Sequence, residues 1–191
     1  MTKRLAAVFL CGALAGCGTL QHDRSLLRAE VTADSNRAAA VADAHHLLAL
    51  LVLPAGAIRS STAPSPAMAH PGDGPPVTPD VVDLHAWWRV KGTLSSVVAF
   101  IGGHAPRGSS ATGNGSSELH GALQMRFLEL SWPPRSGVLG QRWLVVEVAP
   151  LSRGYTGVRA DAQDIWVQPK AASERVPAQA RVLTVSEAFP A

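Results

Sequence analysis

The sequence predicts an α+β fold, a mainly antiparallel sheet with about two helices packed on one face. The order of expected elements is helix, strand, strand, helix and then four strands, and short turns join the first three of these closing strands. With 47% hydrophobic and 16% charged residues in a chain of 191, the composition excludes intrinsic disorder and fits one domain of ordinary size.

The first expected element of the domain is a helix that begins at Asp34 or Ser35, either of which can serve as its N-cap. It runs to about Leu51, because apolar side chains recur at helical spacing at Val41, Ala44, Leu48 and Leu51. Pro54 ends it, since the residue before a proline avoids the helical conformation. A short strand over residues 57–60 follows.

Two stretches predict long loops. Residues 60–79 contain six prolines among Ser, Thr and Gly, a composition typical of extended and mobile chain. Residues 105–121 are rich in Gly and Ser. Unstructured stretches of this length in a compact domain mark either a functional loop or a linker, and we favour loops.

Between these loops we expect a strand over residues 81–90 and a short helix over 96–101, capped by Thr93 or Ser95 and stopped by two glycines. Four further strands are expected, and the first three form an antiparallel meander: 122–132, 141–149, 155–168 and 181–187.

Apolar residues indicate different surroundings for two of these strands. One strand is apolar on both faces, which predicts a central position: Trp143, Leu144, Val145, Val146 and Val148. In the next strand Val158, Ala160 and Ala162 alternate with Arg159, Asp161 and Gln163. That alternation predicts a strand with one face in water.

The amino terminus has the order of a secretory signal peptide. Two basic residues are followed by an apolar run, Leu5–Leu14, which is too short to span a bilayer. The run continues as Leu14-Ala15-Gly16-Cys17, which resembles the lipobox of bacterial lipoproteins. The resemblance implies transfer of diacylglycerol to the Cys17 sulfur, cleavage between Gly16 and Cys17, and acylation of the new amino terminus, for example with palmitate.

The expected organisation is therefore a signal peptide over 1–16, a lipidated tether over 17–33 and one α+β domain over 34–191. The only other cysteine, Cys11, lies in the apolar run, so the processed chain has no other thiol for a disulfide, a metal or a nucleophile.

The lipid on Cys17 makes the membrane the first partner, because two or three acyl chains hold a protein there almost permanently. The expected location is the extracytoplasmic face. In a diderm this is the outer membrane, because residue 18 is Gly18 and not the aspartate by which lipoprotein families signal inner-membrane retention. In a monoderm or an actinobacterium it is the outer face of the cytoplasmic membrane.

The charge balance argues against a nucleic-acid partner. The formal net charge is +3, from 17 basic and 14 acidic side chains. Removal of Lys3 and Arg4 leaves 15 against 14, which is no electrostatic footprint for DNA or RNA. No cofactor is implied either, since the Gly108–Gly113 spacing lacks the lysine that a phosphate-binding loop requires.

Two alternatives to a binding protein stay open. Asp83 and His85 have the same-face spacing of a strand and can act as orienter and base of an envelope hydrolase. The chain has no G-x-S-x-G elbow, so the nucleophile would come from the second loop: Ser109, Ser110, Ser116 or Ser117. The other alternative is metal binding through His85, His104 and His120.

Trp87 and Trp88 are adjacent on a strand and must face opposite sides of the sheet. One can enter the core, while the other is exposed or covered by the proline-rich loop. An exposed tryptophan beside Arg89 can stack on a sugar, a peptide or a partner protein. We therefore predict a membrane-anchored lipoprotein that serves as a non-catalytic binding or accessory module of the cell envelope, with an envelope protein or polysaccharide as partner.

Overall fold

The structure, a computed structural model, describes residues 17–70, 78–119 and 122–169. The chain divides into two compact units, Met1–Glu30 with Pro169–Ala191, and Val31–Gln168. In the first unit the described residues 17–30 are helical, and Leu26 and Leu27 are exposed. The rest of this section concerns the second unit.

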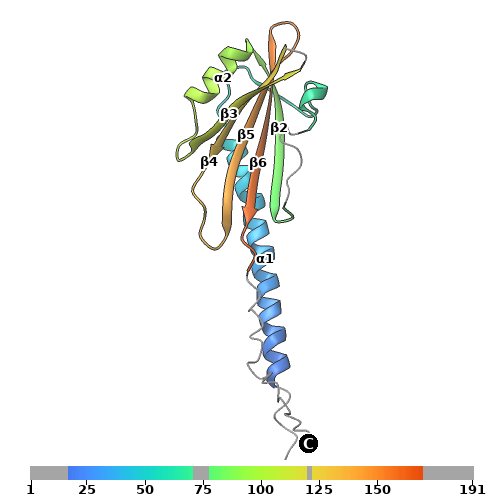
Figure 1. Cartoon of the computed structure of the whole chain (residues 1–191), viewed down its shortest axis with the longest axis vertical. Coiled ribbons are helices and arrows are strands. Elements are labelled where there is room, and N and C mark those ends of the chain that lie inside the picture. The colour runs from blue at the N-terminus through green and yellow to red at the C-terminus, as the bar shows by residue number, and fades with distance from the viewer. Residues whose placement is uncertain (1–16, 71–77, 120–121, 170–191) are drawn as a thin grey trace, which may run out of the picture. The chain divides into compact units, whose positions relative to one another are not determined.

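The second unit is built around one sheet of six strands, antiparallel throughout (Figure 1). The strand order is β1-β2-β6-β5-β4-β3, with bounds β1 Ile58–Ser60, β2 Val81–Lys91, β3 Ser110–Leu119, β4 Ala122–Ser131, β5 Leu139–Pro150 and β6 Tyr155–Trp166. The helices are α1, Cys17–Leu50, and α2, Leu94–Gly103, and a 3₁₀ turn spans Pro66–Met68. The predicted α+β class and its antiparallel meander β4-β5-β6 are confirmed.

The helices pack on one face of the sheet and enclose the core. Ala40, Ala44 and Leu47 of α1 and Val97 and Ile101 of α2 are at most 1% exposed. They belong to one apolar cluster with the even-numbered side chains of β5 and β6, which include Leu144, Val146, Val148, Val158, Ala160 and Ala162. β5 lies between β4 and β6, so its predicted central position is also confirmed.

Helix α1 begins at Cys17, and the expected start at Asp34 or Ser35 is wrong. No glycine or proline occurs between Thr19 and Leu53, and good helix formers such as Leu, Arg, Ala and Glu fill residues 26–30. Asp34 and Ser35 are exposed, so they are tolerated within the helix. A helix rises about 1.5 Å per residue, so the expected tether 17–33 extends less than half as far as extended chain does.

Local signals at the other ends are confirmed. The Thr93 side chain accepts a hydrogen bond from the Ser96 N–H at 3.2 Å and so caps α2. Gly102 and Gly103 are the last residues of that helix. The predicted short strand is β1, and the strand predicted over 81–90 is β2. The strand expected over 181–187 lies outside the described residues.

The loop expected over 105–121 is wrong for most of its length, because residues 110–119 form the edge strand β3. Gly115 lies opposite Phe127 of β4, and a Cβ at residue 115 would overlap the Phe127 ring. The aromatic ring covers the glycine across the strands and compensates for its poor strand propensity. This pairing depends on a residue twelve positions away, so composition alone indicated a loop.

Candidate functional site

The face of the sheet opposite the helices is polar and is centred on Arg159 of β6. This guanidinium donates to both carboxylate oxygens of Asp161, with Nε to Oδ2 at 2.7 Å and Nη2 to Oδ1 at 2.6 Å. Arg159 is 2% exposed and Asp161 is 1% exposed. The prediction that this face of the strand lies in water is therefore wrong. The alternation of apolar and polar residues shows which side chains are polar, but a polar side chain such as an arginine can still be buried when it pairs with a carboxylate.

The first part of the proline-rich loop packs on this face. Met68 is fully buried and lies against Gly157, where the absence of a side chain makes room for it. The Met68 carbonyl accepts two hydrogen bonds, from Arg159 Nη1 at 2.9 Å and from Trp87 Nε1 at 3.1 Å. The expected extended and mobile chain is thus wrong around residues 64–69, where buried contacts and a 3₁₀ turn hold the segment.

Trp87 and Trp88 face opposite sides of β2, as predicted. Trp87 is half-buried beneath the Met68 carbonyl, with Arg159 Cζ 5.8 Å from its ring centre. Trp88 is half-buried on the helix side and packs against the core cluster. Of the three residues expected to bind a partner, only Arg89 is exposed.

Asp83 and His85 also share the polar face, which is the arrangement that their spacing predicts. His85 is exposed, lies opposite Asp161 across the strands, and makes an edge contact with Trp87 at 4.5 Å between ring centres. Burial, and after it the negative charge of Asp161, raises the pKa of Asp83 above its ordinary value of 3.8. Arg159 and His85 act in the opposite direction.

The structure does not bring the candidate serine nucleophiles to His85. Ser110, Ser116 and Ser117 lie on β3, and Ser109 immediately precedes it and donates to the Pro106 carbonyl. Three strands separate β2 from β3, which at about 4.8 Å per spacing is about 19 Å. General-base transfer needs about 3 Å or one bridging water.

The histidines of the metal hypothesis are not assembled within the described residues. His104 follows α2, where its ring stacks on Phe100 at 4.0 Å. His120 lies outside the described residues. Over the ranges that the structure describes, no three His, Cys, Asp or Glu side chains are grouped to hold a metal ion.

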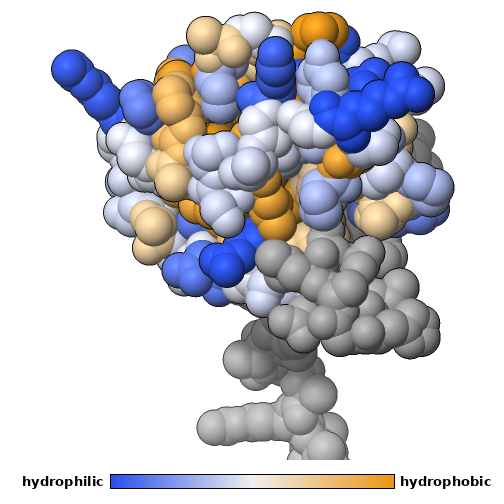
Figure 2. Space-filling model, turned by 90° about the horizontal axis from the view of Figure 1, so that it is seen from above, coloured by the Kyte–Doolittle hydropathy of each residue, from blue (hydrophilic) through white to orange (hydrophobic). Residues whose placement is uncertain are grey.

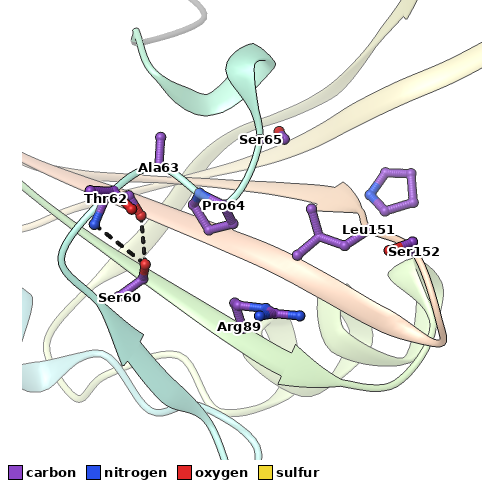
Figure 3. A pocket seen from close by; sticks show the side chains of 9 residues that line it. Ser60, Thr62, Ala63, Pro64, Ser65, Arg89, Leu151 and Ser152 are labelled. Atoms are coloured by element: carbon purple, nitrogen blue, oxygen red, sulfur yellow. Dashed lines mark hydrogen bonds between the residues drawn. The ribbon is translucent and has the colours of Figure 1, made fainter.

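A shallow groove of about 540 Å³ opens beside Arg89, near the end of the sheet where β2 finishes and the β5–β6 turn lies. Figure 2 shows strongly hydrophilic side chains projecting from this end of the molecule. Arg89 points into the groove between the 60–65 segment and the β5–β6 turn (Figure 3). The other described residues of the lining are hydroxyl-bearing or apolar: Ser60, Thr62, Ala63, Pro64, Ser65, Pro150, Leu151 and Ser152.

Short local contacts hold the walls of this groove. The Ser60 hydroxyl donates to the Thr62 carbonyl at 2.6 Å and accepts from the Thr62 N–H at 3.4 Å. The guanidinium of Arg89 lies over the Tyr155 ring, with Cζ 5.1 Å from the ring centre. Among the described residues, no carboxylate lies within ion-pair distance of Arg89. The groove therefore presents one positive charge to solvent.

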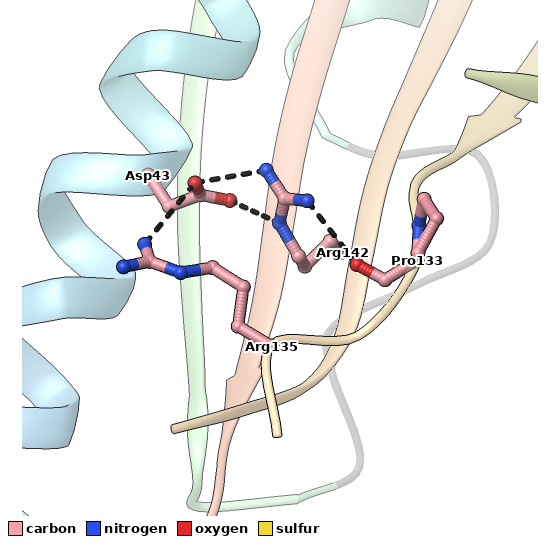
Figure 4. A network of polar contacts seen from close by, with 4 residues as sticks. All are labelled: Asp43, Pro133, Arg135 and Arg142. Atoms are coloured by element: carbon pink, nitrogen blue, oxygen red, sulfur yellow. Dashed lines mark hydrogen bonds and ion pairs between the residues drawn. The ribbon is translucent and has the colours of Figure 1, made fainter. Parts of the chain in front are cut away.

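A second polar cluster lies on the helix side and joins α1 to the sheet (Figure 4). Asp43 is 6% exposed and receives two hydrogen bonds from Arg142, Nε to Oδ2 at 2.6 Å and Nη2 to Oδ1 at 2.9 Å. Arg135 adds a longer ion pair at 3.7 Å. Asn36, seven residues earlier on α1, donates to the carbonyls of Gly137 at 3.1 Å and Val167 at 2.8 Å.

Asp164 of β6 is fully buried beside this cluster, opposite Arg142 in the β5–β6 ladder. Burial, and after it the negative charge of Asp43, raises the pKa of Asp164 to about 7, although Arg142 and Arg135 oppose the shift. When protonated, Asp164 can donate a hydrogen bond to Asp43. Sequence reasoning missed this pair, because the two carboxylates are 121 positions apart in the chain and no local pattern indicates their proximity.

Comparisons with protein-family models, with curated proteins and with solved structures found no match. Among the described residues, the helices are all too short or too polar to cross a bilayer.

Proposed function

We propose that this chain is a lipid-anchored extracytoplasmic protein whose α+β domain is a non-catalytic binding module of the cell envelope. The observation that carries the anchor is the Leu14-Ala15-Gly16-Cys17 lipobox directly after a basic and apolar leader. Acylation of Cys17 supplies the membrane attachment.

The arrangement of the polar sheet face favours binding over catalysis. Asp83 and His85 lie together, but the candidate serines that would complete a hydrolase lie on β3 or directly before it, about 19 Å away. The groove at Arg89 is open and offers a positive charge beside hydroxyl groups. A groove of this kind can bind an anionic ligand.

The anchor is tested by growth of cells that produce the full chain with radiolabelled palmitate. We expect label on the wild-type chain and on Cys11→Ala, which changes the other cysteine, and none on Cys17→Ala. We also expect Cys17→Ala to leave the membrane fraction. Label that persists on Cys17→Ala, or a wild-type chain without label, would contradict the anchor.

The non-catalytic role is tested with envelope polysaccharides and peptides as substrates for the purified full chain. We expect binding without turnover, and we expect His85→Ala to leave binding unchanged. Turnover that is lost in His85→Ala would show that the domain is an enzyme.

A further inference from the structure

We propose that the groove beside Arg89 is a binding site for a carboxylate group, carried by a ligand about the size of one to three sugar or amino-acid residues. The proposal rests on the proposed binding role of the domain and specifies the chemistry that the domain recognises. The volume of about 540 Å³ lies within the range of small-ligand sites.

The lining of the groove suits such a ligand. Among the described residues, Arg89 is the only charged side chain that lines the groove, and a guanidinium holds a carboxylate through two parallel hydrogen bonds. Ser65 and Ser152 bring hydroxyl groups to the same space, and hydroxyls both donate and accept. Pro64 and Leu151 add apolar surface on which the carbon skeleton of a ligand can rest.

Neighbouring residues restrict the position of the Arg89 side chain. Its guanidinium lies over the Tyr155 ring, and Gly157 directly opposite it on β6 has no side chain to obstruct it. Met68 and Pro64 occupy the space above Gly157 and thereby fix the wall that faces Arg89. A ligand therefore meets an arginine whose freedom is already restricted, which reduces the entropy lost on binding.

The surrounding charges attract an anion. Three segments meet around the groove, residues 58–65, 87–95 and 150–157, and they contain four basic side chains and no acidic one. Besides Arg89 these are Lys91 and Arg153, which lie outside the lining, and Arg59, which lies over the Trp88 ring on the helix side of the sheet. One lining guanidinium matches the single charge of a carboxylate, whereas a doubly charged phosphate calls for a second cation within the lining.

Isothermal titration calorimetry on the full chain in detergent micelles tests the site. The two probes each carry one carboxylate: galacturonate, for a uronic acid source, and the peptide acetyl-Ala-Glu-Ala-amide, for a peptide source. Each is paired with its uncharged analogue, galactose or the glutamine peptide. We expect one charged probe to bind, and its identity names the source.

Variants separate the groove from general basicity. Arg89→Gln should weaken binding of that probe at least tenfold, and Ser152→Glu should weaken it similarly by placing a negative charge beside an intact Arg89. Arg107→Gln removes an exposed arginine of the α2–β3 connection and should have no effect. Circular dichroism checks that each variant is folded.

Three results would overturn the proposal: no binding of either charged probe, equal binding of the uncharged analogues, or equal effects of Arg89→Gln and Arg107→Gln. Tighter binding of inorganic phosphate or of phosphatidylglycerol vesicles at Arg89 would also overturn it. Palmitate labelling of Cys17 is measured separately, so failure of the anchor and failure of the groove are distinguishable.

Discussion

Replacement of Asp164 by asparagine should change how the stability of the domain depends on pH. Asp164 is fully buried beside Asp43, and its pKa in the folded chain is about 7, against 3.8 in ordinary surroundings. Between these two values the folded state holds a proton that the unfolded state releases. The free energy of unfolding therefore falls as the pH rises through this window.

The size of the effect follows from the gap between the two pKa values. About three pH units separate them, and each unit corresponds to about 1.36 kcal/mol, so the wild-type chain loses about 4 kcal/mol between pH 4 and pH 8 at this one group. An asparagine side chain is neutral at every pH, resembles the protonated acid and can still donate to Asp43. Asp164→Asn should match the wild type near pH 4 and exceed its stability by about 4 kcal/mol at pH 8.

Urea denaturation from pH 4 to pH 8, followed by tryptophan fluorescence, measures this difference. Trp132 and Trp166 are 9% exposed, so their emission changes on unfolding. The matched control is Asp34→Asn, which changes an exposed carboxylate of α1. The raised pKa of Asp83 is present in all three chains and cancels in the comparison. Parallel stability curves for the wild type and Asp164→Asn would refute the reasoning.

Three other substitutions have expected outcomes. Asp161→Asn removes the carboxylate that Arg159 hydrogen-bonds and leaves Glu147 and Asp83 as the nearby negative charges, so it should lower the free energy of unfolding by about 1.5–3 kcal/mol in urea denaturation. Joint replacement of Arg159 by methionine and Asp161 by leucine should restore most of this loss. An unchanged free energy in the single variant would show that the pair is not buried in solution. Gly115→Ala should lower the free energy of unfolding by about 1–3 kcal/mol, because the new Cβ meets the Phe127 ring. Addition of Phe127→Leu to this variant should recover part of the loss, and equal melting temperatures of wild type and Gly115→Ala would contradict the contact. Asn36→Ala removes two hydrogen bonds by which α1 contacts the rest of the unit and should lower the free energy of unfolding by about 1–3 kcal/mol. Hydrogen exchange should show faster exchange of the amides around residues 36–47, and unaltered exchange would be evidence against these contacts.

The elements that the sequence predicted well are those determined by neighbouring residues. Strand β2 shows its alternation within eleven residues, and Thr93 with Ser96 marks the start of α2 locally. The turn before Tyr155 has positive φ at Arg153 and Gly154, 62° and 72°, and the glycine there signals it in the sequence.

The features that the sequence concealed depend on distant partners. Arg159 looks solvent-facing until Met68, 91 residues earlier, packs over it. Strand β3 looks like a loop until Phe127 covers Gly115. At the candidate site, the sequence predicts an exposed tryptophan beside Arg89, but Trp87 is half-buried and donates a hydrogen bond to the Met68 carbonyl. A local sequence pattern does not indicate a contact with a residue so distant in the chain.

The hydrogen bond from Asn36 to Val167 has a topological consequence. It joins α1, five residues after the start of the second unit, to the residue before the last one of that unit, at the end of the sheet where β6 finishes. A chain whose ends adjoin can be closed by a short linker and reopened at a surface turn, for example at 133–137. The opposite end of the sheet, where Arg89 lies, carries neither terminus of this unit, so a linker between the two ends would lie away from a ligand in the groove.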